Sequence, residues 1–426
     1  MLKRCKWNVI TWLLTLIIAS SFAGNVVTTL AQTEQKVVSE KETKGKLSSS
    51  QSIGKKPKVT ETPKVTVTPT PMPTEIPVTE KFPEVINKTN VRMNATCFTS
   101  EKEATRYFLE MVLNNYYQFG IFAEDLSMLH TKEEYMKLCP VILDMKIESV
   151  TEYKNGYYLD IKNVKTHQID AEEMYAIYTG DTSFLNETEK KAYKKLLSIS
   201  EELKLEGKSD IDKILAIHDY LVLNIAYDED AYRNPKTNES AHYVEGALLN
   251  QLAVCSGYAS TFQLLLLLEG IPCEYVNTDT HAWNLVQVDE KWYHVDVTWD
   301  DPIPDKEGRV LYTHFMMTDS EIAQLDSHGN WNCECGKEKE HNCNDTTYRL
   351  YPYKDYICTT EKEAVKVIKA QKDKDEIVIV YPSKNSLTEK DLLSLVRKNL
   401  SFEGTFYYYP SENLGSSYKV LRVINN

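Results

Sequence analysis

The stretch AVCSGYASTFQLLLLLEGIPCEYVNTDTHAWNLVQVDEKWYHVDVTWDDP, residues 253–302, decides the fold. It opens with a cysteine and several small residues, which lead into a mostly apolar run over 262–268. Gly270 follows that run, as a glycine follows the end of many helices. The pattern predicts a helix that begins at or just after Cys255, where aligned peptide dipoles favour a thiolate. Gly257 would allow a substrate acyl group to approach the backbone beside the sulfur.

The second half of this stretch alternates between apolar and polar residues in HAWNLVQV and again in KWYHVDVTW. Two alternating segments joined by the polar DEK turn predict a β-hairpin. A two- or four-residue loop pairs His281 with Thr298 and Trp283 with Asp296. His281 and Asp296 then share one face of the hairpin, about 7 Å apart at the backbone. A slip of one residue would place them on opposite faces.

A thiol, an imidazole and a carboxylate are the groups that nucleophilic acyl transfer requires. We therefore expect Cys255 to be the nucleophile, His281 the base and Asp296 the carboxylate that orients the imidazole. Taken singly, each residue is better explained as a buried cysteine or an ordinary strand residue. The helix start and the parity of the hairpin together favour the catalytic interpretation.

This part of the chain resembles the transglutaminase-like superfamily, specifically its exported bacterial branch. The resemblance rests on the blocks CSGYA, THAWNLV and WYHVDVTWDDP, and on IHDYLVLNIAYD upstream, and it covers roughly residues 205 to 325. It implies an α+β fold with a papain-like core, in which a nucleophile helix packs on an antiparallel sheet. It also implies the same nucleophile, base and orienting carboxylate. The chain departs from the family pattern in two places. Gln251 and Leu252 stand where a glycine and a basic residue are expected, and Glu290 stands where the hairpin turn usually has glycine.

Other polar and aromatic residues carry weaker expectations. Trp283 and Tyr258 are candidates for substrate binding, although tryptophans in strands more often belong to the core. His218 falls on the apolar face of a predicted helix and is expected to be a core histidine. Asp300 and Asp301 would suit a cation, but two adjacent carboxylates are more often a solvated or capping pair.

A cluster of cysteines and histidines follows in HGNWNCECGKEKEHNC. Thiolates and imidazoles at short spacing suit zinc, but this spacing fits no standard ligand pattern, and export favours a disulfide. We expect no metal and no cofactor in the catalytic site, since no dense acidic loop supports calcium binding. Outside this cluster of cysteines and histidines, Cys273 is the best candidate for a buried thiol. The cluster consists of His328, Cys333, Cys335, His341 and Cys343.

The first 94 residues differ in character from the rest of the chain. Basic residues followed by an apolar run predict a signal peptide over 1–31, with a retained membrane anchor as the alternative. Threonine–proline repeats predict a disordered stalk over 32–94. No membrane span is expected after removal of the signal. The net charge of -13 argues against a nucleic-acid partner, which requires a concentrated positive face.

Two similar segments bracket the middle of the chain. CFTSEKEATRYFLEMV begins at Cys97, and CTTEKEAVKVIKAQ begins at Cys358. Each precedes an apolar strand, a second helix and a two-strand ending. We therefore expect two small α/β modules at 95–165 and 355–426 around a catalytic core at 166–354.

These features predict a secreted or cell-surface enzyme that forms a thioester from a protein or peptide amide. An amine acceptor would give crosslinking, and water would give peptidase or amidase activity; the triad serves both. The competing hypothesis is a non-catalytic cell-surface module that binds or acts as a scaffold.

Overall fold

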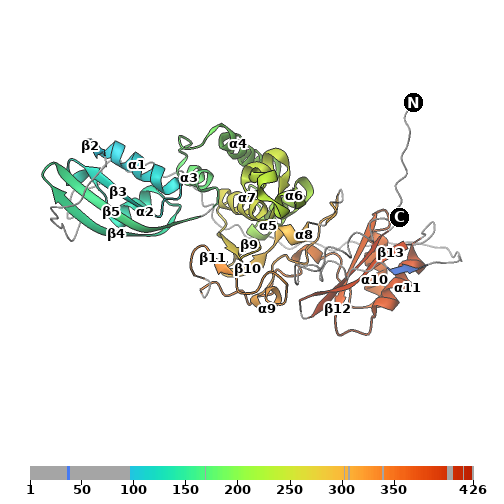
Figure 1. Ribbon diagram of the computed structural model, residues 1–426. Coiled ribbons are helices and arrows are strands. Elements are labelled where there is room, and N and C mark those ends of the chain that lie inside the picture. Colours follow the sequence, from blue (N-terminus) through green and yellow to red (C-terminus); the bar gives the residue numbers. More distant parts are fainter. Residues whose placement is uncertain are drawn as a thin grey trace, which may run out of the picture. The chain divides into compact units, whose positions relative to one another are not determined.

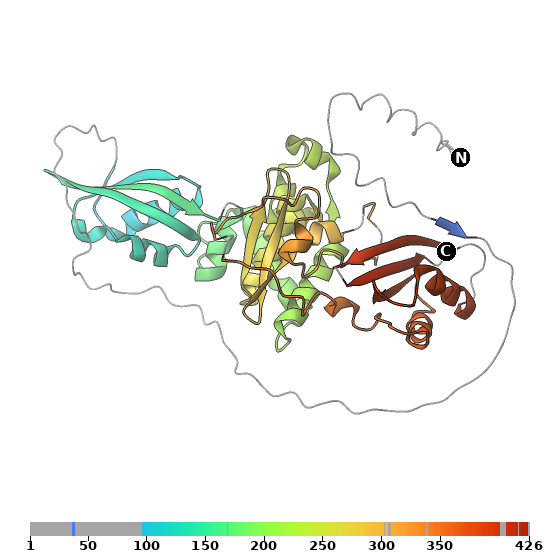
Figure 2. The ribbon, with the colours of Figure 1, turned by 90° about the horizontal axis from the view of Figure 1, so that it is seen from below.

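The computed structural model describes residues 36–38, 96–167, 169–301, 303–305, 308–337, 340–400, 406–415 and 417–424 (Figures 1 and 2). The predicted signal peptide lies outside these residues. So does the predicted stalk, except for strand β1 (Lys36–Val38), which pairs antiparallel with β13 (Phe406–Leu414). Within the described ranges, every helix is too short or too polar to cross a membrane.

The described chain forms two compact units, one ending at Pro352 and one beginning at Tyr353. The first unit contains residues 253–302, where helices pack against an antiparallel sheet of order β10-β9-β8-β11. Its strands are β8 (Cys273–Asn277), β9 (Ala282–Val288), β10 (Lys291–Val295) and β11 (Asn332–Cys333). The helices of this unit that follow residue 170 are α3 (Ala171–Thr179), α4 (Glu187–Glu202), α5 (Asp210–Asn224), α6 (Glu229–Arg233), α7 (Cys255–Leu268), α8 (Val297–Asp300) and α9 (Asp319–Ile322). The same part of the chain contains a parallel pair of strands, β6 (Ala226–Tyr227) and β7 (Leu252–Ala253), and three short helices. Two of these are 3-10 helices, η3 (Pro235–Thr237) and η4 (Glu239–His242), and one is a π-helix, η5 (Gly246–Asn250).

Helix α7 lies at the centre of this unit. Most of its residues are buried, because it packs against α3, α4, α5 and the strands β8 and β9. It ends as the sequence predicts: Gly270 has a φ of 72° and donates its N–H to Leu267. Ile271 donates to Leu266, which satisfies a second carbonyl at the helix end.

The hairpin β9–β10 has the predicted register and a two-residue turn. Val288 pairs with Lys291, and the ladder runs to the pair Asn284 and Val295. The turn residues Asp289 and Glu290 have φ angles of 50° and 63°. A two-residue turn with positive φ at both positions matches the twist of the two strands. Glycine and asparagine adopt positive φ most readily, so they are the usual residues in this type of turn.

Residues 97–166 of the same unit form a small α/β module. Its sheet has the order β2-β3-β5-β4, with β2 parallel to β3 and the other pairs antiparallel. Ser100 caps the first helix by accepting the N–H of Glu103. The elements are β2 (Cys97–Phe98), α1 (Glu101–Leu113), β3 (Gln118–Ala123), η2 (Leu126–Met128), α2 (Lys132–Leu138), β4 (Ile142–Tyr153) and β5 (Gly156–Thr166).

The segment after η6 (Tyr351–Tyr353) has the same order of elements. Thr360 caps its first helix through a capping box with Glu363. Its last strand lies between the other two strands of the module, as β5 lies between β3 and β4. A parallel bridge between Ile357 and Val380 stands where β2 pairs with β3. The elements are α10 (Glu361–Ala370), β12 (Glu376–Pro382), α11 (Glu389–Asn399), β13 and β14 (Tyr418–Ile424).

Candidate active site

Cys255 is the first residue of α7 and is 9 % exposed. Val254, in extended conformation, precedes it and donates its N–H to the carbonyl of Ala241. The first N–H groups of a helix have no acceptor within the helix, and they form the positive end of its dipole. The sulfur therefore lies where the backbone stabilises negative charge.

Gly257 has a different role from the one that its position suggested. A Cβ atom at this residue would lie 2.5 Å from the carbonyl oxygen of Ala241 and 3.3 Å from that of Tyr243. The close approach is therefore made by the backbone of the preceding segment and not by a substrate. Glycine at this position lets the start of α7 pack against residues 241–243.

His281 and Asp296 lie immediately outside the hairpin strands, His281 before β9 and Asp296 after β10. His281 Nε2 is 2.7 Å from Asp296 Oδ2, and Cys255 is a further hydrogen-bonding partner of the ring. Since Nε2 faces the carboxylate, Nδ1 is the nitrogen available to the thiol. The structure thus brings Cys255, His281 and Asp296 together, with the helix and hairpin geometry that the sequence predicts.

The charges of this group are strongly coupled. Burial lowers the pKa of His281, but the Asp296 charge and hydrogen bond, together with Cys255, outweigh burial and raise this pKa to about 10. Burial alone would raise the pKa of Asp296. The charges and hydrogen bonds of His281 and His328 instead hold that pKa far below its usual range. At neutral pH the pair is therefore an imidazolium and a carboxylate.

His328 is a fourth member of the site that sequence reasoning missed. Its Nε2 lies 2.8 Å from Asp296 Oδ2, its Nδ1 lies 2.9 Å from the carbonyl oxygen of Asp326, and its side chain is fully buried. Its ring centroid is 4.7 Å from that of His281. The sequence grouped His328 with the following cysteines, because no local pattern links it to a carboxylate that lies 32 positions earlier.

The segment that contains Cys255 and His281 is similar to a known family. Residues 198–297 match the family model of the transglutaminase-like superfamily. The central segment belongs to the transglutaminase-like superfamily. The matched segment ends one residue after Asp296 and contains Cys255 and His281.

Two curated relatives of this transglutaminase-like domain are the kyphoscoliosis peptidases of mouse and human. The mouse protein (Mus musculus) is 25 % identical over 167 residues, which cover 35 % of this chain and 24 % of the relative. The human protein (Homo sapiens) is 24 % identical over 195 residues, which cover 41 % and 28 %. The chain thus spans about a quarter of the length of these relatives. A crystal structure of a TGase is 17 % identical, with 45 % of this chain and 53 % of that chain covered and a TM-score of 0.25.

The two residues predicted to bind substrate in this transglutaminase-like domain are both buried. Trp283 is 1 % exposed, stacks on His281 with ring centroids 5.7 Å apart, and donates Nε1–H to His294. Tyr258 is 0 % exposed and donates its hydroxyl to the carbonyl of Ile225. Neither side chain is exposed in this structure, so their contact with substrate stays a prediction; Trp283 packs against the imidazole of His281.

The carboxylates after the hairpin also belong to the interior. Asp300 is fully buried and accepts hydrogen bonds from His218 and His314, which hold its pKa at about 2 although burial opposes this. His218 is a core histidine, as expected, and its pKa is about 9 because two aspartates outweigh the effect of burial. Asp301 is 5 % exposed and accepts the hydroxyl of Tyr258. Neither carboxylate is solvated, because both are bound by side chains of the core, although Asp301 does lie at the C-terminal cap of α8.

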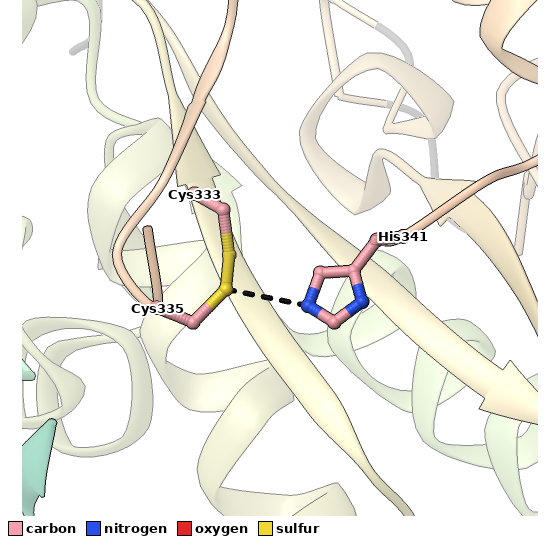
Figure 3. Close-up of side chains that lie close together, drawn as sticks. All are labelled: Cys333, Cys335 and His341. Atoms are coloured by element: carbon pink, nitrogen blue, oxygen red, sulfur yellow. Dashed lines mark hydrogen bonds between the residues drawn. A yellow bond between two sulfur atoms is a disulfide. The ribbon is translucent and has the colours of Figure 1, made fainter. Parts of the chain in front are cut away.

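The cysteine-rich cluster forms a disulfide between Cys333 and Cys335 (Figure 3). His341 Nε2 lies 3.3 Å from Cys335 Sγ, whereas His328 faces Asp296 and does not join this cluster. Cys343 is a buried free thiol. The free cysteines of the described chain also include Cys273, where burial raises the thiol pKa well above its usual value.

Proposed function

We propose that this protein is a cysteine-dependent acyl-transfer enzyme that acts on protein or peptide amides through a thioester at Cys255. The observation that carries this proposal is the position of His281, which contacts both Asp296 and Cys255 at the start of α7. The names of the two curated relatives, which are peptidases, support the same chemistry.

The first half-reaction breaks the amide bond. The Cys255 thiolate attacks the carbonyl carbon, and the negative charge moves to the carbonyl oxygen. The imidazolium of His281 then gives its proton to the leaving nitrogen, the C–N bond breaks and the thioester remains. Asp296 holds the ring and offsets its positive charge throughout.

The second half-reaction regenerates the thiolate. Neutral His281 takes a proton from the acceptor, which is water in hydrolysis or a primary amine in crosslinking, while the acceptor attacks the thioester carbonyl. The C–S bond breaks and sulfur leaves as the thiolate beside the re-formed imidazolium. Both outcomes use the same residues, so the acceptor decides between peptidase and transamidase activity.

The test is to trap the thioester on the full-length protein. Wild type is incubated with casein and with a fluorescent primary amine, and acid-quenched samples are examined by peptide mass spectrometry. We expect an acyl adduct on Cys255, together with new peptide ends or amine incorporation. Cys255→Ala should show neither. Equal product from Cys255→Ala, or no adduct and no product with a broad set of protein substrates, favours the non-catalytic binding or scaffold module.

We further propose that the enzyme acts outside the cytoplasm, on protein at a cell surface. The support is the charged and then apolar start of the chain and the threonine–proline tract that follows it. Cell fractionation with an antibody against the catalytic unit tests this proposal. Recovery of the protein in the cytosolic fraction with residues 1–31 still attached would contradict it.

A further inference from the structure

A buried tryptophan and a buried histidine pack beside the catalytic imidazole on one face of the β9–β10 hairpin. His294 pairs with Leu285 across the hairpin, and Trp283 lies two residues before Leu285, so Trp283 and His294 are diagonal neighbours. The indole of Trp283 is nearly parallel to the imidazole of His281, with an interplanar angle of 19°, and its centroid lies 4.6 Å from that of His328. The orientation of this indole therefore affects both histidines that bind the catalytic carboxylate.

The hydrogen bonds of His294 fix which ring nitrogen carries the proton. The indole N–H of Trp283 can only donate, and it lies 3.0 Å from Nδ1 of His294, so Nδ1 accepts and has no proton. The proton is therefore on Nε2, which lies 3.0 Å from Asp319 Oδ1. Burial and the charge of His328 lower the pKa of His294 more than Asp319 raises it, so the ring is neutral at neutral pH. Asp319 is itself held in place, because Oδ2 accepts the N–H of Cys343 at 3.0 Å.

We propose that His294 is a positioning residue that holds the indole of Trp283 in place and, through it, the imidazole of His281. This role presupposes the proposed acyl-transfer chemistry, but His294 itself lies away from substrate, since it is 0 % exposed. The imidazole of His281 has to reach Cys255 with one ring nitrogen and Asp296 with the other, so a rotation of the ring breaks one of the two contacts. A displacement of about 1 Å at such a group costs about a hundredfold in rate.

The competing role for His294 is packing, because its ring is buried and Trp331 packs edge-on against it with centroids 5.2 Å apart. Three substitutions separate the two roles, since each imitates a different part of the ring. His294→Asn places an oxygen at about the position of Nδ1 and so keeps an acceptor for Trp283. His294→Gln reaches Asp319 as Nε2 does, but it leaves the indole N–H without its acceptor. His294→Phe keeps only the shape of the ring.

The experiment measures kcat and KM of the full-length protein with casein and a fluorescent primary amine, and the rate of iodoacetamide labelling at Cys255. His294→Gln and His294→Phe should lower kcat and the labelling rate at least about tenfold, with KM within about threefold of wild type, whereas His294→Asn should lose no more than about threefold.

A double-mutant cycle tests the route through the indole. Trp283→Phe keeps an aromatic ring against His281 but has no N–H, so His294→Gln should lower kcat by less than about twofold in that background. His341→Gln is the matched control, because His341 is also buried and packs on a strand tryptophan, Trp292, with centroids 4.2 Å apart. It should leave kcat within about twofold of wild type.

Three results would overturn the proposal. Folded His294→Phe with the kcat and labelling rate of wild type shows that the ring positions nothing. Equal losses in His294→Asn and His294→Phe, or additive losses in the cycle, assign His294 to packing. The third result needs no variant: the ¹⁵N shifts of the His294 ring in wild type should be those of the neutral Nε2–H form, and a proton on Nδ1 excludes the bond to Trp283.

Failure of the proposed function is distinguishable from failure of this role. Wild type without turnover on any substrate refutes the acyl-transfer proposal. The labelling rates and the ¹⁵N shifts require no turnover, so they still decide whether His294 holds the indole and the imidazole in place.

Discussion

Replacement of Asp296 by asparagine tests the electrostatics of the site. Asp296 is fully buried and lies 2.7 Å from His281 Nε2, and its charge is the main influence that raises the His281 pKa to about 10 against the effect of burial. Asparagine has nearly the same shape but no charge. Asp296→Asn removes the largest contribution that opposes burial, so the pKa of His281 should fall from about 10 toward its ordinary value of 6.5.

The size of the effect follows from these values. At pH 7.5 a group with a pKa of about 10 is more than ~99 % protonated, whereas one with a pKa of 6.5 is only about 10 % protonated. The imidazolium beside Cys255 would thus be present in about a tenth of the molecules. We expect the rate of iodoacetamide labelling at Cys255 to fall at least about tenfold at pH 7.5.

The pKa of His281 also determines how the stability of the fold depends on pH. The folded pKa of His281 is raised, so its pairing with Asp296 stabilises the fold fully below about pH 6.5, and this contribution is lost as the pH rises through about 10. Asp296→Asn should remove this alkaline dependence from the urea midpoint. The two measurements, labelling and unfolding, report the same charge pair independently.

The direct assay is an NMR titration of ¹³C-labelled histidine, with the His281 resonance assigned by its loss in His281→Gln. His328→Gln is the matched control, because it removes a neighbouring ring and leaves the Asp296 charge in place; the His281 pKa should then remain well above 6.5. A His281 pKa that stays near 10 in Asp296→Asn would refute the assignment of Asp296 as the group that holds His281 protonated.

Three further tests address other parts of the structure. Cys255→Ala and His281→Ala should each lower turnover by at least about a thousandfold while circular dichroism shows an intact fold, and residual turnover above that level would exclude the assigned roles. His328→Gln should lower kcat by about tenfold with little change in KM, since His328 positions Asp296 and does not touch substrate; an unchanged kcat would assign it a packing role only. Glu290→Gly should raise the free energy of unfolding by up to about 1 kcal/mol, because Glu290 has a φ of 63° in the hairpin turn and glycine adopts such a φ without strain. The control is Glu103→Gly at an exposed position inside α1, which should lower the free energy of unfolding by about as much.

The parts of the site that sequence predicts are those governed by local periodicity. The helix start at Cys255 follows from the apolar run and from Gly270, and the hairpin register follows from the two-residue turn and from alternation. These features fix which face each strand residue occupies, and they place His281 and Asp296 next to each other at the open end of the hairpin. The register does not extend to the predicted pair of His281 and Thr298, because the chain leaves the strand at Asp296 to begin α8.

The parts that sequence does not predict depend on segments packed together from distant positions. His328 lies in an irregular segment and reaches Asp296 only through tertiary packing. The burial of side chains in β9 is also hard to predict from sequence. Apolar and polar residues alternate along this strand, but nearly all of them, including Trp283, are buried.

The two oxygens of the Asp296 carboxylate have different partners, one in the backbone and one in the side chains of the site. Oδ1 accepts the backbone N–H of Trp299 at 3.0 Å and so caps α8, while Oδ2 accepts from both His281 and His328. Asparagine can keep the cap with its oxygen, but its NH₂ group then faces the two ring nitrogens and requires them to accept. A ring nitrogen that accepts belongs to a neutral imidazole. The capping bond therefore orients the asparagine so that it favours neutral His281, in the same direction as the lost charge.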